Sequence, residues 1–252
     1  MESHKLLVFD ISGEYGHFRK FNTTSSPLTY SIPTRSALAG ILGAILGIER
    51  EVSVGVFPDG MVSVNELFSP EKVDIAIQIL NPIKKTNIGF NLLDTGKSPS
   101  SFFNIQNRTQ IEYELLKYPK FRIFLRHRDA RIMEELTQRI KAVNHHFTPY
   151  LGLSQFTAMV EFVRATNAIS MTTEEGFTSI CTAVNLSKLE TNPPIKFEKD
   201  NAFYATDTLP MVMRRDRVVT DYSEILIERT TKPILVNTRN YWTTALGNIL
   251  FL

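Results

Sequence analysis

Several side chains in this sequence could carry general acid–base chemistry. One reaction of this kind, the metal-free cleavage of a phosphodiester beside a hydroxyl group, needs a base for the hydroxyl proton, an acid for the leaving oxygen and a cation for the phosphate. Side chains of these types are His17, Tyr30, Lys84, Lys85, His145 and His146. The adjacent pair His145 and His146 is more typical of a solvated helix end, and His127 suits a phosphate contact or a solvated turn equally. The residues alone therefore assign no catalytic set.

Metal and redox chemistry have little support in the sequence. Cys181 is the single cysteine, so neither an internal disulfide nor a cysteine zinc cluster can form. The sequence contains no HExxH motif and no closely spaced set of carboxylates, which are the patterns typical of metal sites. We therefore expect no metal and no cofactor. The cysteine content suits a reducing cytoplasm, where we expect the protein to be located.

Charge gives a weak signal for a nucleic-acid partner. The net charge is +2, which is too small by itself to indicate nucleic-acid binding. Residues 117–141 are locally basic and residues 50–77 lean acidic. A basic face permits phosphate binding but fits a solvated helix face as well. No apolar run reaches the roughly 18 residues of a membrane span, and the N-terminus lacks a signal-peptide pattern. We therefore expect no membrane contact.

Two helices and several strands should position these side chains. In Pro33–Ile48, apolar residues recur at helical spacing, and Ser31 or Thr34 can cap the helix. Gly40, Gly43 and Gly47 within it indicate close packing on a sheet, because their spacing does not fit a dinucleotide-binding turn. A second helix is expected at residues 130–143, after Asp129. Strands are expected at residues 5–11, 17–21, 73–80, 111–116, 121–125 and 158–168.

This order of elements predicts an α+β fold of the ferredoxin-like (RRM-type) kind, β-α-β-β-α-β, with two helices on one face of a four-stranded antiparallel sheet. The predicted domain covers residues 1–168 and contains an insertion at about residues 81–110. Residues 81–108 have few periodic apolar positions and are expected to lack regular structure. Residues 169–252, with short strands broken by prolines, predict a small β-rich C-terminal domain.

An ordered set of segments resembles one known family. The segment Phe9–Arg19 (FDISGEYGHFR) fits the family's first strand and its G-x-x-A/G-x-F-R pattern. Ser31–Gly47 (SIPTRSALAGILGAILG) fits its proline-led, glycine-spaced first helix. Tyr113–Leu125 and Pro149–Phe156 resemble later blocks, and Leu209–Arg217 does so weakly. The chain thus resembles the CRISPR-associated protein family five, in the style of the type I-B branch.

The resemblance implies a role in antiviral defence. Family members hold the 5′ handle of the guide RNA (crRNA) in type I surveillance (Cascade) complexes. The implied partners are the crRNA 5′ handle, the backbone subunit, the large subunit and, through the complex, target DNA. The insertion at residues 81–108 would form a thumb that touches the backbone subunit, and the C-terminal part would contact the large subunit.

The residues at one end of the predicted sheet support an RNA site. A helix N-terminus presents free N–H groups to an anion, and aromatic rings can stack on unpaired bases. Phe18 and Phe21 are equally suited to the core of a strand. The predicted RNA-binding residues are His17, Phe18, Arg19, Lys20, Tyr30, Thr34, Arg35, Ser36, Lys84, Lys85 and Arg108.

Three functions remain open at this stage. A non-catalytic binding subunit is favoured, because no catalytic triplet of the RNA-cutting subtype I-C relatives can be placed on the chain. The alternative is a metal-independent endoribonuclease that processes precursor crRNA. A ferredoxin-like scaffold without an RNA role is the least supported, since it leaves the ordered motifs unexplained.

Overall fold

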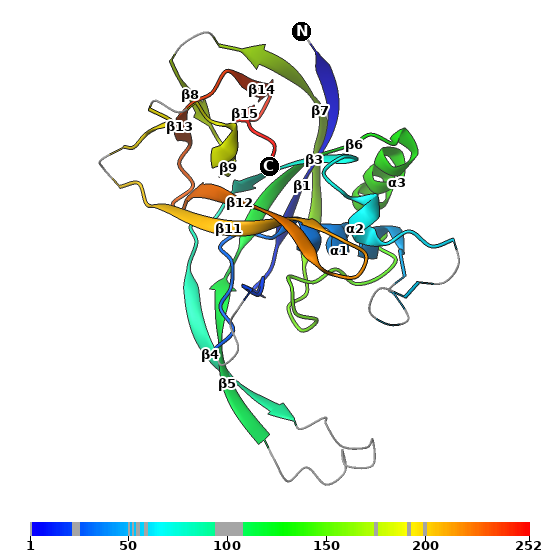
Figure 1. The fold of residues 1–252 in the computed structure, drawn as a ribbon. Coiled ribbons are helices and arrows are strands. Elements are labelled where there is room, and N and C mark those ends of the chain that lie inside the picture. Colours follow the sequence, from blue (N-terminus) through cyan, green and yellow to red (C-terminus); the bar gives the residue numbers. More distant parts are fainter. Residues whose placement is uncertain are drawn as a thin grey trace.

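The computed structural model is mostly β, with helices gathered on one side of a large sheet and a two-stranded arm that extends away from it (Figure 1). It describes residues 2–21, 26–49, 51, 53, 56–57, 60–93, 108–173, 176–190, 193–198 and 201–252. The mixed helix and strand content agrees with the expected α+β class, although strands predominate.

The large sheet has six strands in the order β15-β14-β7-β1-β6-β3. Four of its strands are β1 (Ser3–Ser12), β3 (Val73–Ile79), β6 (Lys120–His127) and β7 (Met159–Thr172), with β3 at the edge, and each pairs antiparallel with its neighbours. The strands expected at residues 5–11, 73–80, 121–125 and 158–168 are therefore present. β14 (Asn240–Thr244) and β15 (Gly247–Ile249) extend this sheet beyond β7, although they come from the end of the chain.

The two long helices, α1 (Arg35–Leu46) and α3 (Ala130–Lys141), form where the apolar periodicity predicts them. Thr34 caps α1, because its hydroxyl oxygen accepts a hydrogen bond of 3.2 Å from the backbone N–H of Ala37. Asp129 caps α3 by accepting from the N–H of Arg131 at 2.8 Å. A short helix, α2 (Val64–Leu67), lies beside α1.

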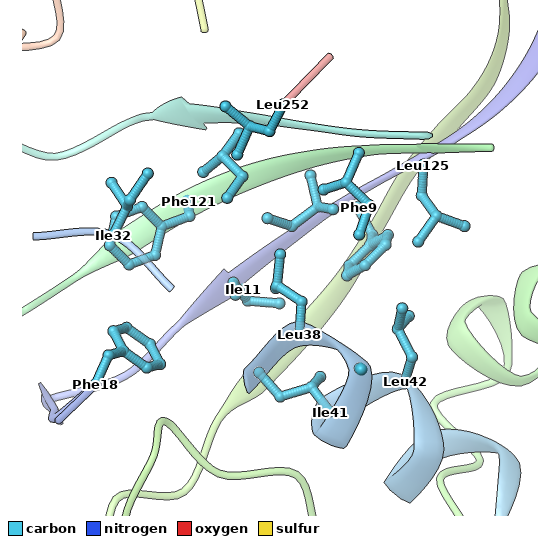
Figure 2. Packing of buried hydrophobic residues seen from close by; sticks show 14 of the residues in the cluster. Phe9, Ile11, Phe18, Ile32, Leu38, Ile41, Leu42, Phe121, Leu125 and Leu252 are labelled. Carbon is cyan, nitrogen blue, oxygen red and sulfur yellow. The ribbon is translucent and has the colours of Figure 1, made fainter. Parts of the chain in front are cut away.

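The main core lies between α1 and the sheet. Figure 2 shows Leu38 and Leu42 of α1 with Phe9 of β1 and Phe121 of β6, and all four side chains are at most 1% exposed. Phe18 also belongs to this core. Burial of this apolar surface is the main force that holds α1 in place. The helix is thus fixed rigidly, with its N-terminus at one end of the sheet.

The three glycines in and directly after α1 differ in their surroundings. A Cβ added at Gly43 would lie 2.5 Å from Cγ1 of Val64, so Gly43 allows close packing against α2 rather than against the sheet. Gly47 ends the helix with φ +81°, a left-handed conformation that glycine adopts without strain. Gly40 faces open space. The expected packing of the glycines on a sheet is therefore wrong for these positions.

The other face of the sheet is also covered. Leu6 and Val8 of β1 and Phe124 of β6 pack there against Ile249 and Phe251. The guanidinium of Arg122 adds two hydrogen bonds, of 2.8 and 3.0 Å, to the carboxylate of Asp10. RNA-recognition modules of the RRM type stack bases on exposed aromatic residues of this face. The covered face offers no such platform among the described residues.

The insertion is more regular than expected. β4 (Lys85–Leu93) and β5 (Arg108–Lys117) pair over nine residues as an antiparallel ribbon, which is the arm in Figure 1. The expectation of irregular structure is therefore wrong for residues 85–93 and 108, while residues 94–107, including Lys97, lie outside the described part. The ribbon is stabilised by hydrogen bonds between its two strands and has no regular apolar repeat. Its sequence therefore gives only a weak indication of strand structure.

The stretch expected as a strand at residues 17–21 is mostly a loop. β2 (Tyr15–Gly16) pairs briefly with β5, and Arg19 and Thr29 form an isolated bridge. The remaining strands of the chain form two small sheets: β8 (Phe177–Ile180), β10 (Ile195–Lys196) and β13 (Ile234–Asn237) in one, and β9 (Val184–Asn185), β11 (Tyr204–Met213) and β12 (Val219–Glu228) in the other. A 3₁₀ turn, η2 (Leu186–Lys188), follows β9.

Candidate nucleic-acid interface

Three adjoining cavities meet at Arg19 and Ser36, beside the N-terminal half of α1. The first, of about 450 Å³, is lined by His17, Tyr113 and Tyr150 among others, and we call it the His17 cavity. The second, of about 980 Å³, reaches Arg215 and Arg217, and the third, of about 470 Å³, reaches Phe21 and Tyr222. Because all three include Arg19 and Ser36, we describe them together as the α1 groove.

One face of α1 forms the floor of this groove. Ser36, Gly40 and Ala44 are spaced four residues apart, so they lie on one helical face, and all three line the groove. The small side chains keep the groove open along the helix. The positive end of the helix dipole lies at the Ser36 end, and the first turn contains no acidic residue. An anion is therefore favoured at this end.

The second wall comes from the distant β11–β12 ribbon. Met213, at the end of β11, lines the second and third cavities, and Tyr222 of β12 lines the third. Arg217 forms an ion pair with Glu51, and Cζ of Arg215 lies 4.5 Å from the centre of the Phe57 ring. These contacts connect the turn after β11 to the loop after α1. The groove is thus enclosed by segments that are far apart in sequence.

The loop that carries Arg19 is fastened to β11. Lys20 forms an ion pair with Asp207, and its Nζ lies 5.4 Å from the centre of the Tyr30 ring. The second carboxylate oxygen of Asp207 accepts a hydrogen bond of 3.1 Å from the N–H of Ser31. Asp207 is 7% exposed, so water competes little for these bonds. The buried carboxylate thereby fixes both sides of this loop.

His17 is buried at the back of the groove, with 2% of its surface exposed. Its Nδ1 lies 2.8 Å from the carbonyl oxygen of Glu114, so Nδ1 must carry the proton that is donated. Burial lowers the pKa of His17, and the positive charge of Arg19 contributes to the same shift. Among the described residues its Nε2 has no hydrogen-bond partner. Nε2 of neutral His17 is therefore an unused acceptor, and it is itself buried.

Besides His17, four of the predicted contact residues have buried side chains. Phe18 and Tyr30 are 3% and 6% exposed, so neither ring is open for stacking in this conformation. The guanidinium of Arg35 points inward and donates a hydrogen bond of 2.7 Å to the carbonyl of Val73, and burial lowers its pKa to about 10. Thr34 uses its hydroxyl as the helix cap. These four side chains therefore support the groove from the protein interior.

The basic residues of the arm lie apart from the α1 groove. Lys85 binds the carbonyl oxygen of Thr29 at 2.7 Å and the carboxylate of Glu114 at 3.0 Å, so it joins the arm to the loop. Lys84 is exposed next to it. Arg108 begins β5, but its side chain lies outside the described part. The structure thus brings together His17, Arg19, Lys20, Thr34 and Ser36, but not the predicted residues of the arm.

Several residues of the groove were missed by sequence reasoning. They are Tyr113, Tyr150, Gly152, Met213, Arg215, Arg217 and Tyr222. Gly152 has φ +88°, and a Cβ there would overlap the carbonyl oxygen of His17, so glycine lets this loop close the His17 cavity. The sequence feature that could have identified some of these residues is the resemblance of Pro149–Phe156 and Leu209–Arg217 to segments typical of the family.

The structure supplies no support for a metal site or a membrane span. Within the described ranges, no group of three or more His, Cys, Asp or Glu side chains is arranged to hold a metal ion. No helix in that part of the chain has the length and apolar content needed to cross a membrane.

The basic stretch at 117–141 is partly neutralised, because Arg126 and Arg139 form ion pairs with Asp74 and Glu135.

Comparison with known proteins adds independent information. The chain has the fold of a component of a CRISPR RNA-guided surveillance complex, with a TM-score of 0.50 and 11% identity over 90% of this chain and 91% of that chain. It also matches a CRISPR protein from Archaeoglobus fulgidus, with a TM-score of 0.51 and 12% identity over 97% of both chains. A comparison with curated protein sequences gives no significant match. The model of the CRISPR-associated protein family Cas_Cas5 matches residues 6–225, and the chain therefore belongs to this family.

Proposed function

We propose that this protein is the non-catalytic subunit of a type I-B-like CRISPR surveillance (Cascade) complex that binds and caps the 5′ handle of the crRNA in the α1 groove. The observation that carries the proposal is the meeting of three cavities at Arg19 and Ser36, beside the N-terminus of α1. The family and the fold support a place in such a complex.

The groove suits a single strand of RNA. A phosphate would lie against the first turn of α1 and Arg19, where the helix dipole and the basic side chain both attract it. Exposed rings border the groove: Phe21 is 70% exposed and Tyr150 and Tyr222 are each 40% exposed. Such rings stack on bases with little sequence preference. The inward-facing Phe18 and Tyr30 would act as supports.

The other assignments form part of the same proposal. The β4–β5 arm would touch the backbone subunit, with Lys84 exposed at its base, and residues 169–252 would link to the large subunit that recognises target DNA. The β-α-β-β-α-β order with strands arranged β7-β1-β6-β3 supports the ferredoxin-like assignment for residues 1–168. The second part supplies β14 and β15 to that sheet, so the two proposed domains would form one folding unit.

A matched pair of arginines tests the groove. Arg215 lines the groove, whereas its neighbour Arg214 is ion-paired with Asp216 outside it. With a labelled single-stranded crRNA handle, Arg215→Ala should weaken binding, and Arg214→Ala should bind as the wild type does. Equal affinities for all three proteins would argue against the α1 groove as the RNA site.

A second candidate function is processing of precursor crRNA by metal-independent cleavage. The observation that favours it is neutral His17 beside Arg19 in the groove, which could accept a 2′-hydroxyl proton once its buried Nε2 is uncovered. Incubation of the purified protein with labelled precursor RNA and a chelator distinguishes the two functions. We expect intact RNA. Cleavage that disappears in His17→Asn, with an effect of about 100-fold or more, would establish the endoribonuclease instead.

A further inference from the structure

The end of the α1 groove that lies away from Ser36 carries two arginines. Arg215 and Arg217 belong to the turn between β11 and β12, and both line the second cavity together with Gly43 of α1. Gly43 lies about 10 Å along the helix axis from Ser36. Both arginine side chains are exposed, and a guanidinium is the side-chain group best suited to bind phosphate oxygens. This end therefore has donors for a second phosphate, beyond the one at Arg19.

A carboxylate of the protein itself already binds one of these arginines. Glu51 lines the same cavity, and its Oε1 forms an ion pair with Nη2 of Arg217. The side chain of Glu51 is 12% exposed, whereas that of Arg217 is 46% exposed and faces the groove. A carboxylate and a phosphate offer a guanidinium the same kind of partner, a negatively charged oxygen. Glu51 therefore takes the position at Arg217 that a phosphate oxygen of a bound strand would use.

The second arginine is held in a different way. The guanidinium of Arg215 lies over the ring of Phe57, a contact that uses its flat face and leaves the N–H groups at its edge able to donate. Hydrogen bonds from Ser63 lower the pKa of Glu66, and the charge of Arg215 adds a smaller effect. Oε2 of Glu66 already accepts from the N–H and the hydroxyl of Ser63, at 3.0 and 2.9 Å. Within the described part of the chain Arg215 forms no ion pair, so it can bind a phosphate directly.

We propose that Arg215 and Arg217 form a second phosphate subsite of the α1 groove, and that the carboxylate of Glu51 occupies it until an RNA phosphodiester replaces it at Arg217. This inference rests on the proposed function, since the strand is the one that lies in the groove. The exchange breaks the ion pair, so Glu51 lowers the affinity for a strand that reaches this end. Binding at Arg19 and Ser36 leaves the ion pair intact. Glu51 therefore acts as an internal competitor at one end of the groove only.

Binding of a labelled single-stranded RNA to the full-length chain tests this inference. Glu51→Gln keeps the shape of the side chain and removes its charge, and we expect about two- to fivefold tighter binding, the range of a partly exposed ion pair. The control is Glu49→Gln, which removes the same charge from the same cavity, although Glu49 forms no ion pair among the described residues. Its gain should be smaller. Equal gains for the two variants, or no gain for Glu51→Gln, would overturn the inference, and weaker binding would show that the ion pair only holds the turn in place.

A double-mutant cycle tests whether the effect of Glu51 acts through Arg217. In an Arg217→Ala background, Glu51→Gln should gain no more affinity than Glu49→Gln does, because the ion pair is already absent. A gain as large as in the wild-type background would show that Glu51 repels RNA by its charge alone, which would overturn the exchange. Thermal melts check that the variants are folded. If Arg217→Ala does not fold, the comparison of the two glutamate variants in the wild-type background decides.

The salt dependence of binding identifies the group that replaces Glu51. The slope of log K against log salt should be steeper for Glu51→Gln than for the wild type by up to about 0.7, because one more phosphate is then neutralised. Tighter binding with an unchanged slope would mean that a base lies at Arg217, and the phosphate assignment would be wrong. If RNA binding depends on Arg215 but Glu51→Gln brings no gain, the groove stands and the exchange fails. If binding does not depend on Arg215, both proposals fail.

Discussion

Lys20 and Asp207 are 187 positions apart in sequence, yet their side chains form an ion pair that holds the loop at residues 20–31 against β11. The same carboxylate receives the backbone N–H of Ser31. The loop that carries Arg19 is thus positioned by a residue of the C-terminal part. The shape of the α1 groove therefore depends on contacts across the whole chain.

Asp207→Asn should loosen this loop. The neutral amide keeps the shape but loses the charge that pairs with Lys20, and hydrogen bonds to charged groups contribute about 1.5–3 kcal/mol. We expect a lower free energy of unfolding in urea by that order and weaker RNA binding. The control is Asp221→Asn, an exposed aspartate on β12. A variant as stable as the wild type would show that the ion pair does not hold the loop.

Arg19 and Arg35 should respond differently to alanine substitution, although the sequence places them in the same cluster. Arg19 is exposed in the groove, so Arg19→Ala should leave the melting temperature nearly unchanged and reduce the slope of log K against log salt by about 0.7. Arg35 is 5% exposed, and its guanidinium donates a hydrogen bond to the carbonyl oxygen of Val73. Arg35→Ala should lower the melting temperature instead. The opposite pattern would contradict the burial of Arg35.

Two glycines of α1 offer a test of the packing on α2. Gly40→Ala should stabilise the protein by about 0.5–1 kcal/mol, because alanine favours the helix and a Cβ there meets open space. Gly43→Ala should gain less or lose stability, since its Cβ would press on Val64. Urea unfolding of both variants measures the difference. Equal gains would mean that α2 does not pack closely on α1.

Stability should fall in mild acid because of His17. Burial lowers the pKa of His17 below its ordinary value near 6.5, with Arg19 adding to the shift and the carbonyl and carboxylate of Glu114 opposing it. Below about pH 6.5 the unfolded chain therefore binds a proton that the folded chain does not. The free energy of unfolding should decrease as pH falls from 6.5 towards the folded pKa and should be level above pH 7.

The comparison protein for this pH dependence is His17→Asn. Its free energy of unfolding should change less steeply between pH 7 and pH 5 than that of the wild type. His145, whose pKa burial also lowers, remains in both proteins and contributes equally. Identical slopes would show that His17 is not buried in its neutral form.

Local patterns predicted much of the fold. The strands of the large sheet before β14 and both long helices follow from apolar periods of two and 3.6, and the caps Thr34 and Asp129 follow from their side chains. Residues 85–93 were missed because a two-stranded ribbon is stabilised by backbone pairing across strands, which leaves little trace in a single segment. The prediction of a strand at residues 17–21 is wrong because hydrogen bonds to Leu28, Thr29 and Leu151 determine the backbone conformation there.

The sequence by itself determined the family resemblance, the position of α1 with Ser36 in its first turn, and the prediction that Arg19 lies in an adjacent loop. Tertiary structure decided which neighbours face the groove. Phe18, Tyr30 and Arg35 are buried because α1, the sheet and β11 cover them, whereas Tyr150, Arg215 and Tyr222 reach the groove from distant segments. The physical reason is that the burial of a side chain depends on the surfaces packed against it, and several of those surfaces come from residues that are distant in sequence.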